Sequence, residues 1–207
     1  AKFNQKDGLN PIDHYTYTFL GDGCLMEGIS HEVCSFAGTH KLGKLICFYD
    51  QNGISIDGEI TNWFTDNTVQ RFASYNWQVL EVDGHNVEQI LEAIKNAQEE
   101  SNQPTLICCK TKIGFGSPNK AGTSGVHGSP LGDEEIAKTR NQLGWEHEPF
   151  DIPANIKSQW DARDSGSKHN SDWDMLMKEY SKIHPELFNE LERLINNKLP
   201  NDFEKCY

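Results

Sequence analysis

Short apolar runs alternate with amphipathic segments over most of the chain. Four runs rich in β-branched and aromatic residues end at glycine or other turn formers, which is typical of buried strands, and they cover residues 15–20, 45–49, 77–82 and 105–109. Between and after them, apolar residues recur at helical spacing, which predicts helices over residues 25–39, 67–75, 86–98 and from 133 to just before Gly144. This alternation predicts an α/β fold, a doubly wound and mainly parallel sheet with helices on both faces.

The pattern changes after Pro153, where the strand-like runs stop. The remaining residues are polar and partly helical, with a helical run around residues 186–196. We therefore predict an α/β domain over residues 1–153 and a helical extension over residues 154–207. The chain begins without methionine and reaches its first strand almost at once, so we expect it to be a piece of a larger protein.

Charge and cysteine usage narrow the class of protein. The chain has 19 basic and 31 acidic side chains, a formal charge of −12, which disfavours nucleic acid and anionic membrane surfaces as partners. The 6 cysteines form no CxxC pair, which favours reduced, buried thiols over a metal or redox site. No apolar run approaches the length of a membrane span and no signal segment opens the chain, so we expect a cytoplasmic protein.

The candidate chemistry lies where two predicted strands end. Gly21-Asp22-Gly23 follows the first strand and Asn52 follows the second, and parallel strands present their carboxyl ends at one edge of a sheet. Mg²⁺ prefers hard oxygen ligands, so Asp22, the Asn52 amide oxygen and the backbone carbonyl of Ile54 form a plausible set. Glycines beside Asp22 leave room for a diphosphate to approach the backbone. The alternative is a turn aspartate and a helix cap.

Dinucleotide binding is a competing interpretation of the same turn. Strand, Gly-x-Gly and helix are shared with that site, and Asp50 ends the second strand where a ribose-binding acid would lie. Met26, however, occupies the position of the third glycine. Asp22 inside the turn would also repel a pyrophosphate in the absence of a metal. The pattern therefore favours a metal-bound diphosphate.

Longer strings resemble one family of thiamine diphosphate enzymes. GDGCLMEGISHE at residues 21–32 and DQNGISIDG at residues 50–58 resemble the thiamine diphosphate and magnesium motif of transketolases. IGFGSPNKAG at residues 113–122 and the Val126-His127-Gly128 string do so too. Where the family often has Asn-Asn or Asp-Asn, this chain has Gln51-Asn52 and keeps the ligand. The resemblance extends from about Asp13 to Pro153 and fades after it.

The resemblance implies a role for each matching residue. Mg²⁺, or another divalent cation such as Ca²⁺, would be bound by Asp22, Asn52 and the Ile54 carbonyl, and the diphosphate would be contacted by Gly23 and Asn52. Ile54 and Ile113 would lie against the thiazolium ring, and His127 against the cofactor and the sugar, where a histidine can donate to an oxygen or move a proton. From the residues alone, a surface histidine and ordinary packing remain alternatives.

Two acids on the helix predicted over residues 25–39, Glu27 and Glu32, are also expected to have a role. Ile29 and Val33 predict partial burial of that helix, and in the family Glu27 and Glu32 would join a network that links two active sites across a dimer. Solvated helix acids are the alternative. His31, His40 and His85 are assigned to structure or solvent.

The implied activity is that of a transketolase of the pentose phosphate pathway. Such an enzyme transfers a two-carbon ketol unit from a ketose phosphate to an aldose phosphate. In the family, the glutamate that activates the cofactor belongs to a pyrimidine-binding domain contributed by the partner subunit, and nothing in these 207 residues matches that domain. We therefore expect half a cofactor site and no turnover by the chain alone. A dihydroxyacetone synthase, a non-catalytic module of the same fold and a dinucleotide-dependent oxidoreductase remain alternatives.

Overall fold

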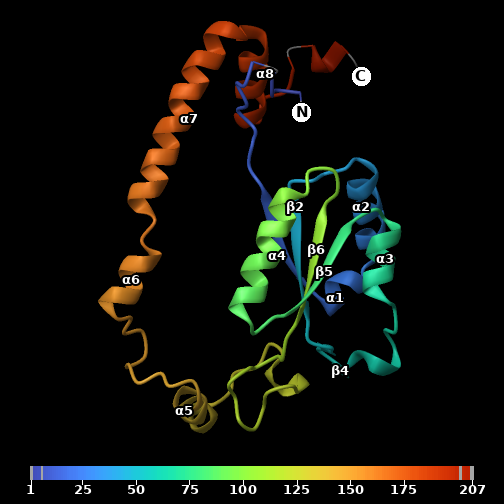
Figure 1. Ribbon diagram of the computed structural model, residues 1–207, viewed down its shortest axis with the longest axis vertical. Coiled ribbons are helices and arrows are strands. Elements are labelled where there is room, and N and C mark those ends of the chain that lie inside the picture. Colours follow the sequence, from blue (N-terminus) through green and yellow to red (C-terminus); the bar gives the residue numbers. More distant parts are fainter. Residues whose placement is uncertain (1, 6, 201, 206–207) are drawn as a thin grey trace. The chain divides into compact units, whose positions relative to one another are not determined.

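The computed structural model describes residues 2–5, 7–200 and 202–205 (Figure 1). Residue contacts divide the chain into two compact units. The sheet unit is Tyr15–Glu146, and the helical unit combines Ala1–His14 with His147–Tyr207. The first residues thus group with the C-terminal helices, whereas the sequence pattern placed them with the α/β domain. The two-domain division at Pro153 stays a prediction.

The sheet unit is built on four parallel strands in the order β1-β2-β6-β5. They are β1 (Thr16–Gly21), β2 (Leu45–Gln51), β5 (Gln78–Asp83) and β6 (Thr105–Lys110). A two-residue hairpin, β3 (Ile54–Ser55) with β4 (Gly58–Glu59), follows β2. In the register, Gly21 is paired with Asp50, so the two turns predicted to carry the site leave neighbouring strands side by side. The predicted parallel α/β fold is confirmed.

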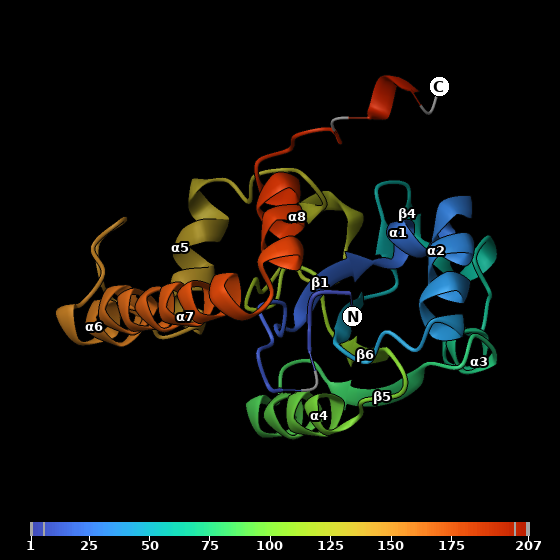
Figure 2. The same cartoon turned by 90° about the horizontal axis from the view of Figure 1, so that it is seen from above.

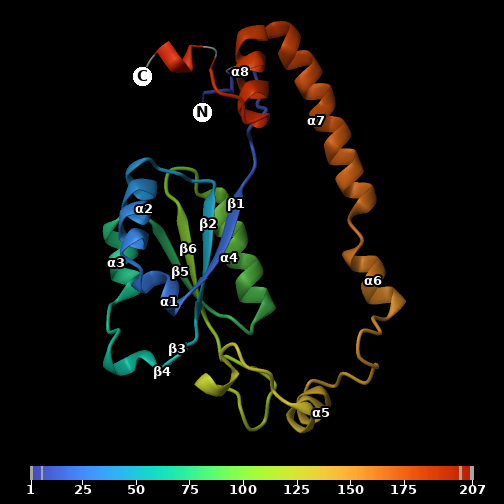
Figure 3. The same ribbon diagram turned by 180° about the vertical axis from the view of Figure 1, so that it is seen from behind.

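Helices cover both faces of this sheet (Figures 1 and 3). One face carries α1 (Asp22–Met26), α2 (Gly28–Thr39) and α3 (Thr68–Ser74), and the other carries α4 (Val87–Glu99). The unit also contains η1 (Ile60–Asn62), η2 (Ser124–Val126) and α5 (Asp133–Gln142). Asn86 caps α4 as predicted, because its side chain accepts the Gln89 N–H at 3.0 Å.

Strand alternation sorts the core into two layers. Along β2, Cys47 and Tyr49 point toward α1, α2 and α3, whereas Ile46 and Phe48 point toward α4. On the α4 side, Ala93 and Ala97 are buried, and their small side chains let the helix approach the strands closely. Because β1 and β2 are parallel neighbours, their carboxyl ends lie at the same edge of the sheet.

The helix expected over residues 25–39 is two helices. The chain is extended at Glu27, with φ −67° and ψ 132°, and this residue separates α1 from α2. Helix α1 begins at Asp22 itself, so the glycine turn is already helical. The helical spacing of apolar residues in α2 predicted the helix, but nothing in the sequence pattern indicated the break at Glu27.

The helical unit consists of α6 (Ala154–Trp160), α7 (Arg163–Ile183), α8 (Pro185–Ile195) and η3 (Phe203–Lys205). Helix α7 continues through Ser165-Gly166-Ser167 and is more regular than the predicted partial helix, and it packs against α8 (Figure 2). The N-terminal segment is tied to these helices by the Tyr180 hydroxyl, which donates to the Phe3 carbonyl at 2.7 Å. Within the described part of the chain, no helix is long and apolar enough to cross a membrane.

The cysteines are mostly inaccessible, as the sequence pattern predicts. Cys47, Cys108 and Cys109 are buried, Cys34 is half-buried and Cys24 is exposed. Burial raises the pKa of the Cys47 and Cys108 thiols to about 12, so both stay protonated at neutral pH. Cys206 lies outside the described residues.

Candidate cofactor site

Asp22 is a buried carboxylate at the end of β1. Its side chain is only 2% exposed, and each of its oxygens accepts a hydrogen bond from the β2 side of the site. The Tyr49 hydroxyl donates to Oδ1, and the Gly53 N–H donates to Oδ2 at 3.0 Å. The structure therefore places Asp22 against the Asn52-Gly53 turn, where the strand positions predict it to be. Burial and the bond to Asp22 raise the pKa of the Tyr49 hydroxyl, which stays a donor.

Asn52 is held at both ends of its side-chain amide. Its Oδ1 accepts the Ile54 N–H at 2.9 Å, and its Nδ2 donates to Asp50 Oδ2 at 3.2 Å. An amide oxygen has two lone pairs, so Oδ1 can still accept a second contact. Ile54 is 8% exposed and opens the β3–β4 hairpin.

The glycines around Asp22 face open space. A Cβ on Gly21, Gly23 or Gly53 would meet no heavy atom within 4 Å. Gly53 also has φ +71°, a left-handed conformation that favours glycine. Among the described residues, no group of three or more His, Cys, Asp and Glu side chains could hold a metal ion. The proposed oxygen set, one carboxylate with an amide and a carbonyl oxygen, nevertheless fits Mg²⁺ and leaves room for a diphosphate.

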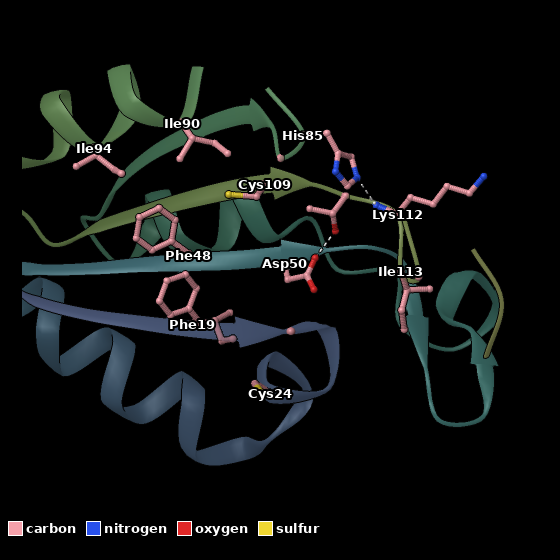
Figure 4. A pocket seen from close by; sticks show the side chains of 15 residues that line it. Phe19, Cys24, Phe48, Asp50, His85, Ile90, Ile94, Cys109, Lys112 and Ile113 are labelled. Atoms are coloured by element: carbon pink, nitrogen blue, oxygen red, sulfur yellow. Dashed lines mark hydrogen bonds between the residues drawn. The ribbon is translucent and has the colours of Figure 1, made fainter. Parts of the chain in front are cut away.

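A groove of about 840 Å³ opens beside this turn, between α4 and the ends of β1, β2 and β6 (Figure 4). Its floor is apolar, with Phe19 stacked on Phe48 at a ring-centroid distance of 5.0 Å and Phe19 80% exposed. Ile113 lies in the lining, whereas Asp22, Asn52 and His127 do not. The structure thus separates the metal-ligand candidates Asp22 and Asn52 from the open groove next to them.

Polar residues form one end of the groove. They are Asp50, His85, Thr111 and Lys112. His85 Nε2 accepts the Lys112 N–H at 3.0 Å, and the His85 ring stacks on Phe115 at 4.1 Å. His85 therefore supports the loop after β6, in keeping with the structural role expected of it, although it also lines the groove.

An acid that the sequence pattern did not reveal holds residues 117–119, in the loop that leads to His127. Glu135, buried at the start of α5, accepts hydrogen bonds from the Ser117 hydroxyl, from the Asn119 N–H at 2.8 Å and from Asn119 Nδ2 at 2.9 Å. These bonds lower the pKa of Glu135 to about 2. His127 itself is exposed, and its N–H donates to the Ser124 carbonyl at 3.0 Å.

The partial burial expected for Glu27 and Glu32 is wrong for this chain. Glu27 and Glu32 are exposed, and Ile29 and Val33 are 65% and 53% exposed. Helix α2 packs on the sheet through another side, where Ala37 and Gly38 are buried. The apolar residues that suggested burial form an outward stripe.

Two other contributors were missed. Tyr49 holds Asp22, and Asp50 holds Asn52, yet the sequence pattern indicated only an apolar strand and a turn. The signal was available in principle, because Leu20 pairs with Tyr49 and Gly21 pairs with Asp50, which brings both residues to the strand ends that lead into the Asp22 and Asn52 turns. That register depends on how the two strands pair in the sheet, and it cannot be deduced from the sequence of either strand alone.

Comparison with known proteins identifies the family. Residues 1–200 match the family described as transketolase, thiamine diphosphate binding domain. Transketolase 2 of Escherichia coli is 56% identical over 206 residues, which cover 99% of this chain and 31% of that protein. Transketolase 1 of Pasteurella multocida is 58% identical over 200 residues, which cover 96% of this chain and 30% of that protein.

Solved structures agree with these relatives. A transketolase of Pichia stipitis in complex with fructose 6-phosphate has a TM-score of 0.89 at 40% identity, covering 99% of this chain and 30% of that one. The transketolase of Leishmania mexicana has a TM-score of 0.90 at 35% identity, covering 98% of this chain and 31% of that one. The chain thus spans about 30% of the length of these relatives.

The match corrects the extent of the resemblance. It was expected to fade after Pro153, but it continues to residue 200, and it begins before Asp13. The helical unit lacks the glycine and histidine strings that carried the resemblance, so its membership was not recognised from motifs. The match also leaves the dinucleotide-binding alternative without support. The chain belongs to the family of transketolase thiamine diphosphate-binding domains.

Proposed function

We propose that this chain supplies the magnesium and diphosphate half of the cofactor site of a transketolase. The complete enzyme would transfer a two-carbon ketol unit from a ketose phosphate to an aldose phosphate, in the pentose phosphate pathway. The observation that carries the proposal is the buried Asp22 carboxylate hydrogen-bonded to Gly53, next to Asn52, at the carboxyl edge of a parallel sheet. A cytoplasmic location stays a prediction.

Three oxygen ligands would hold the cation. They are an Asp22 carboxylate oxygen, Asn52 Oδ1 and the Ile54 carbonyl oxygen, with Mg²⁺ as the cation or Ca²⁺ in its place. Gly23 and Asn52 would contact the diphosphate in the open space in front of the glycines. When bound, thiamine diphosphate supplies the nucleophilic carbon and the electron sink for ketol transfer, and the protein binds and orients it.

The loop after β6 would supply further contacts. Ile113, in the groove lining, and Ile54 would exclude water from the ring of the cofactor. His127 would lie against the cofactor and the sugar and hold a proton at a substrate oxygen. The Glu135 contacts support this assignment, because they give the loop a defined shape without using His127.

The exposed stripe on α2 supports a dimer. Ile29, Val33 and Phe36 are all more than half exposed and lie on one helical face. We infer that a second subunit covers them, brings Glu27 into a buried network, and contributes the pyrimidine-binding domain that completes the site. The chain alone would then have no turnover. A dihydroxyacetone synthase would share this site, and substrate profiling of the complete protein distinguishes the two.

Calorimetric titration of thiamine diphosphate with and without Mg²⁺ tests the half-site. The samples are this chain and the full-length protein that carries it, with NAD as the control ligand. We expect the full-length protein to bind thiamine diphosphate only with the metal, Asp22→Ala to abolish binding, and Asp83→Ala, at the end of β5 on the same edge, to retain it. Metal-independent binding, or binding that survives Asp22→Ala, contradicts the proposal. Ketol transfer by the 207-residue chain alone contradicts the half-site.

A further inference from the structure

Asp50 lies between two hydrogen-bond donors at the end of β2 (Figure 4). The Thr111 hydroxyl donates to its Oδ1, and Asn52 Nδ2 donates to its Oδ2 at 3.2 Å. Asn52 in turn accepts the Ile54 N–H through Oδ1 at 2.9 Å. A chain of hydrogen bonds thus runs from β6 across β2 to the candidate ligand Asn52.

These hydrogen bonds fix the orientation of the Asn52 side-chain amide. The oxygen and nitrogen of a side-chain amide are nearly the same size, so its orientation is decided by its partners. An ionised carboxylate only accepts, so Asp50 requires Nδ2 on its own side. The amide oxygen must then face the Ile54 N–H, with one lone pair left over. Reversal of the amide would set Oδ1 against the Asp50 carboxylate and Nδ2 against the Ile54 N–H, two repulsive contacts.

Thr111 is itself fixed by the strand ends. Its N–H donates to the Gln51 carbonyl at 3.3 Å, which ties the residue after β6 to β2. A Cβ on Gly84 would lie only 2.3 Å from the methyl carbon of Thr111, which is too close for both atoms to fit. A side chain at residue 84 would displace Thr111, so the glycine at the end of β5 lets the hydroxyl reach Asp50.

We propose that Asp50, held by Thr111, is a positioning residue that presents the Asn52 oxygen to the cation. The inference rests on the proposed magnesium and diphosphate site. The alternative is that Asp50 binds the cation directly. Asp50 is hydrogen-bonded directly to the candidate ligand Asn52 and to Thr111, which favours positioning, and variants of Asp50 and Thr111 distinguish the two roles. Outer partners that orient a metal ligand commonly contribute a factor of about 10 to 100 in metal affinity.

The first test measures the Mg²⁺ concentration that gives half-maximal thiamine diphosphate binding by the full-length protein. We expect Asp50→Asn and Thr111→Val to raise it by a factor of about 10 or more, with binding restored at saturating Mg²⁺. Thr111→Ser keeps the hydroxyl and should match the parent protein, and Asp83→Asn is the matched control at another strand end.

The outcomes separate the two proposals. An Asp50→Asn value equal to the parent value overturns the positioning role. A large effect of Asp50→Asn with none from Thr111→Val also overturns it, because it indicates a direct ligand. If the parent protein binds without metal, or Asp22→Ala binds normally, the proposed cofactor site fails instead.

The second test needs no metal or cofactor. In ¹⁵N spectra of the 207-residue chain, the side-chain NH₂ signals of Asn52 are assigned from their loss in Asn52→Asp. We expect one proton to be shifted downfield and to exchange slowly because it is bonded to Asp50. Asp50→Asn and Thr111→Val should move this signal upfield and speed its exchange, and Asp83→Asn should not. Unchanged Asn52 signals in both variants overturn the inference.

Discussion

The Asp22 carboxylate is nearly inaccessible to solvent, so the hydrogen bonds that it accepts must offset the free energy lost when it leaves water. Tyr49→Phe removes the donor to Oδ1 and keeps the ring that fills the core. A hydrogen bond to a charged group contributes about 1.5–3 kcal/mol, so we expect a loss of that order in the free energy of unfolding, measured by urea titration. Tyr17→Phe, which removes an exposed hydroxyl bonded to Gln98, is the control and should cost under about 1 kcal/mol. Equal losses in the two variants contradict this account of Asp22.

Cys24 is the thiol best placed to report on the site. It is exposed, lines the groove and follows Gly23, whereas Cys47 and Cys108 are buried with a pKa raised to about 12. Because the thiolate is the reactive form, iodoacetamide at mildly alkaline pH should modify Cys24 well before Cys47 or Cys108.

Thiamine diphosphate with Mg²⁺ should slow this modification in the full-length protein. The sites are identified by mass spectrometry of the digested protein, with Asp22→Ala as the variant that loses protection. Protection in that variant, or early labelling of Cys108, contradicts the prediction.

How far individual residues could be predicted depends on where their partners lie. Asp22, Asn52 and the neighbouring glycines were identified because each follows an apolar run, a feature local to the sequence. Tyr49 and Asp50 were not, since their roles depend on the pairing of β1 with β2. The exposure of Ile29 and Val33 was mispredicted for a related reason. A helical stripe shows that a surface is apolar, but not which body covers it.

At the scale of elements, the four strands and α4 were predicted well because their patterns are strong and bounded by turn formers. The break at Glu27 escaped because helical periodicity continues across it. Helix α7 was underestimated since its first half is polar and contains Gly166, and polar helices show no apolar stripe. The hydrogen bonds that hold Ser117 and Asn119 in the loop after β6 were also missed, because their acceptor, Glu135, lies in another element, α5.

Close packing of α2 gives a test within one helix. A Cβ on Gly38 would lie 1.7 Å from the Tyr75 carbonyl oxygen, a backbone atom that cannot move away on its own. Gly38→Ala should therefore destabilise the sheet unit by about 2 kcal/mol or more, although alanine is the better helix former. Gly28→Ala, in the same helix with nothing within 4 Å, should stay within about 1 kcal/mol of the parent. Urea titration measures both, and a stable Gly38→Ala variant contradicts the packing.

Glu135 makes the loop after β6 sensitive to acid. Its pKa is about 2 in the folded chain against an ordinary 4.5, so the folded state favours the ionised form. The stabilisation is therefore fully present above the ordinary pKa and is lost as the pH falls from about 4.5 toward 2. Glu135→Gln cannot titrate. Its side-chain amide presents either an NH₂ group, which cannot accept, or a neutral oxygen, which is a weaker acceptor, to the Asn119 N–H.

We expect the parent chain to be more stable than Glu135→Gln at neutral pH and the gap to shrink through this acid range. Parallel urea titrations from neutral to acidic pH measure the difference, in which groups common to both chains cancel. A gap that stays constant with pH contradicts the assignment.

The whole molecule combines a motif-rich sheet unit with a helical unit that has no diagnostic strings. The motifs predicted the first unit, whereas the second had only the pattern of a helical extension. The association of residues 1–14 with the C-terminal helices has no local sequence signal. That association depends on contacts between residues more than 150 positions apart, such as Tyr180 with Phe3 and Trp173 with Pro11. Local patterns carry no information about such contacts.

The division into two units predicts that each loses its structure separately. Tyr180 is fully buried in the helical unit, where its hydroxyl bonds the Phe3 carbonyl, and Phe72 is 1% exposed in the core of the sheet unit. Truncating either ring leaves a cavity that costs about 3–5 kcal/mol. Tyr180→Ala should therefore speed hydrogen exchange in α7 and α8 and leave β2 and β6 protected, while Phe72→Ala should do the reverse. Mass spectrometry of peptides from the two variants measures this directly. Loss of protection throughout the chain in either variant would mean that the two units unfold as one.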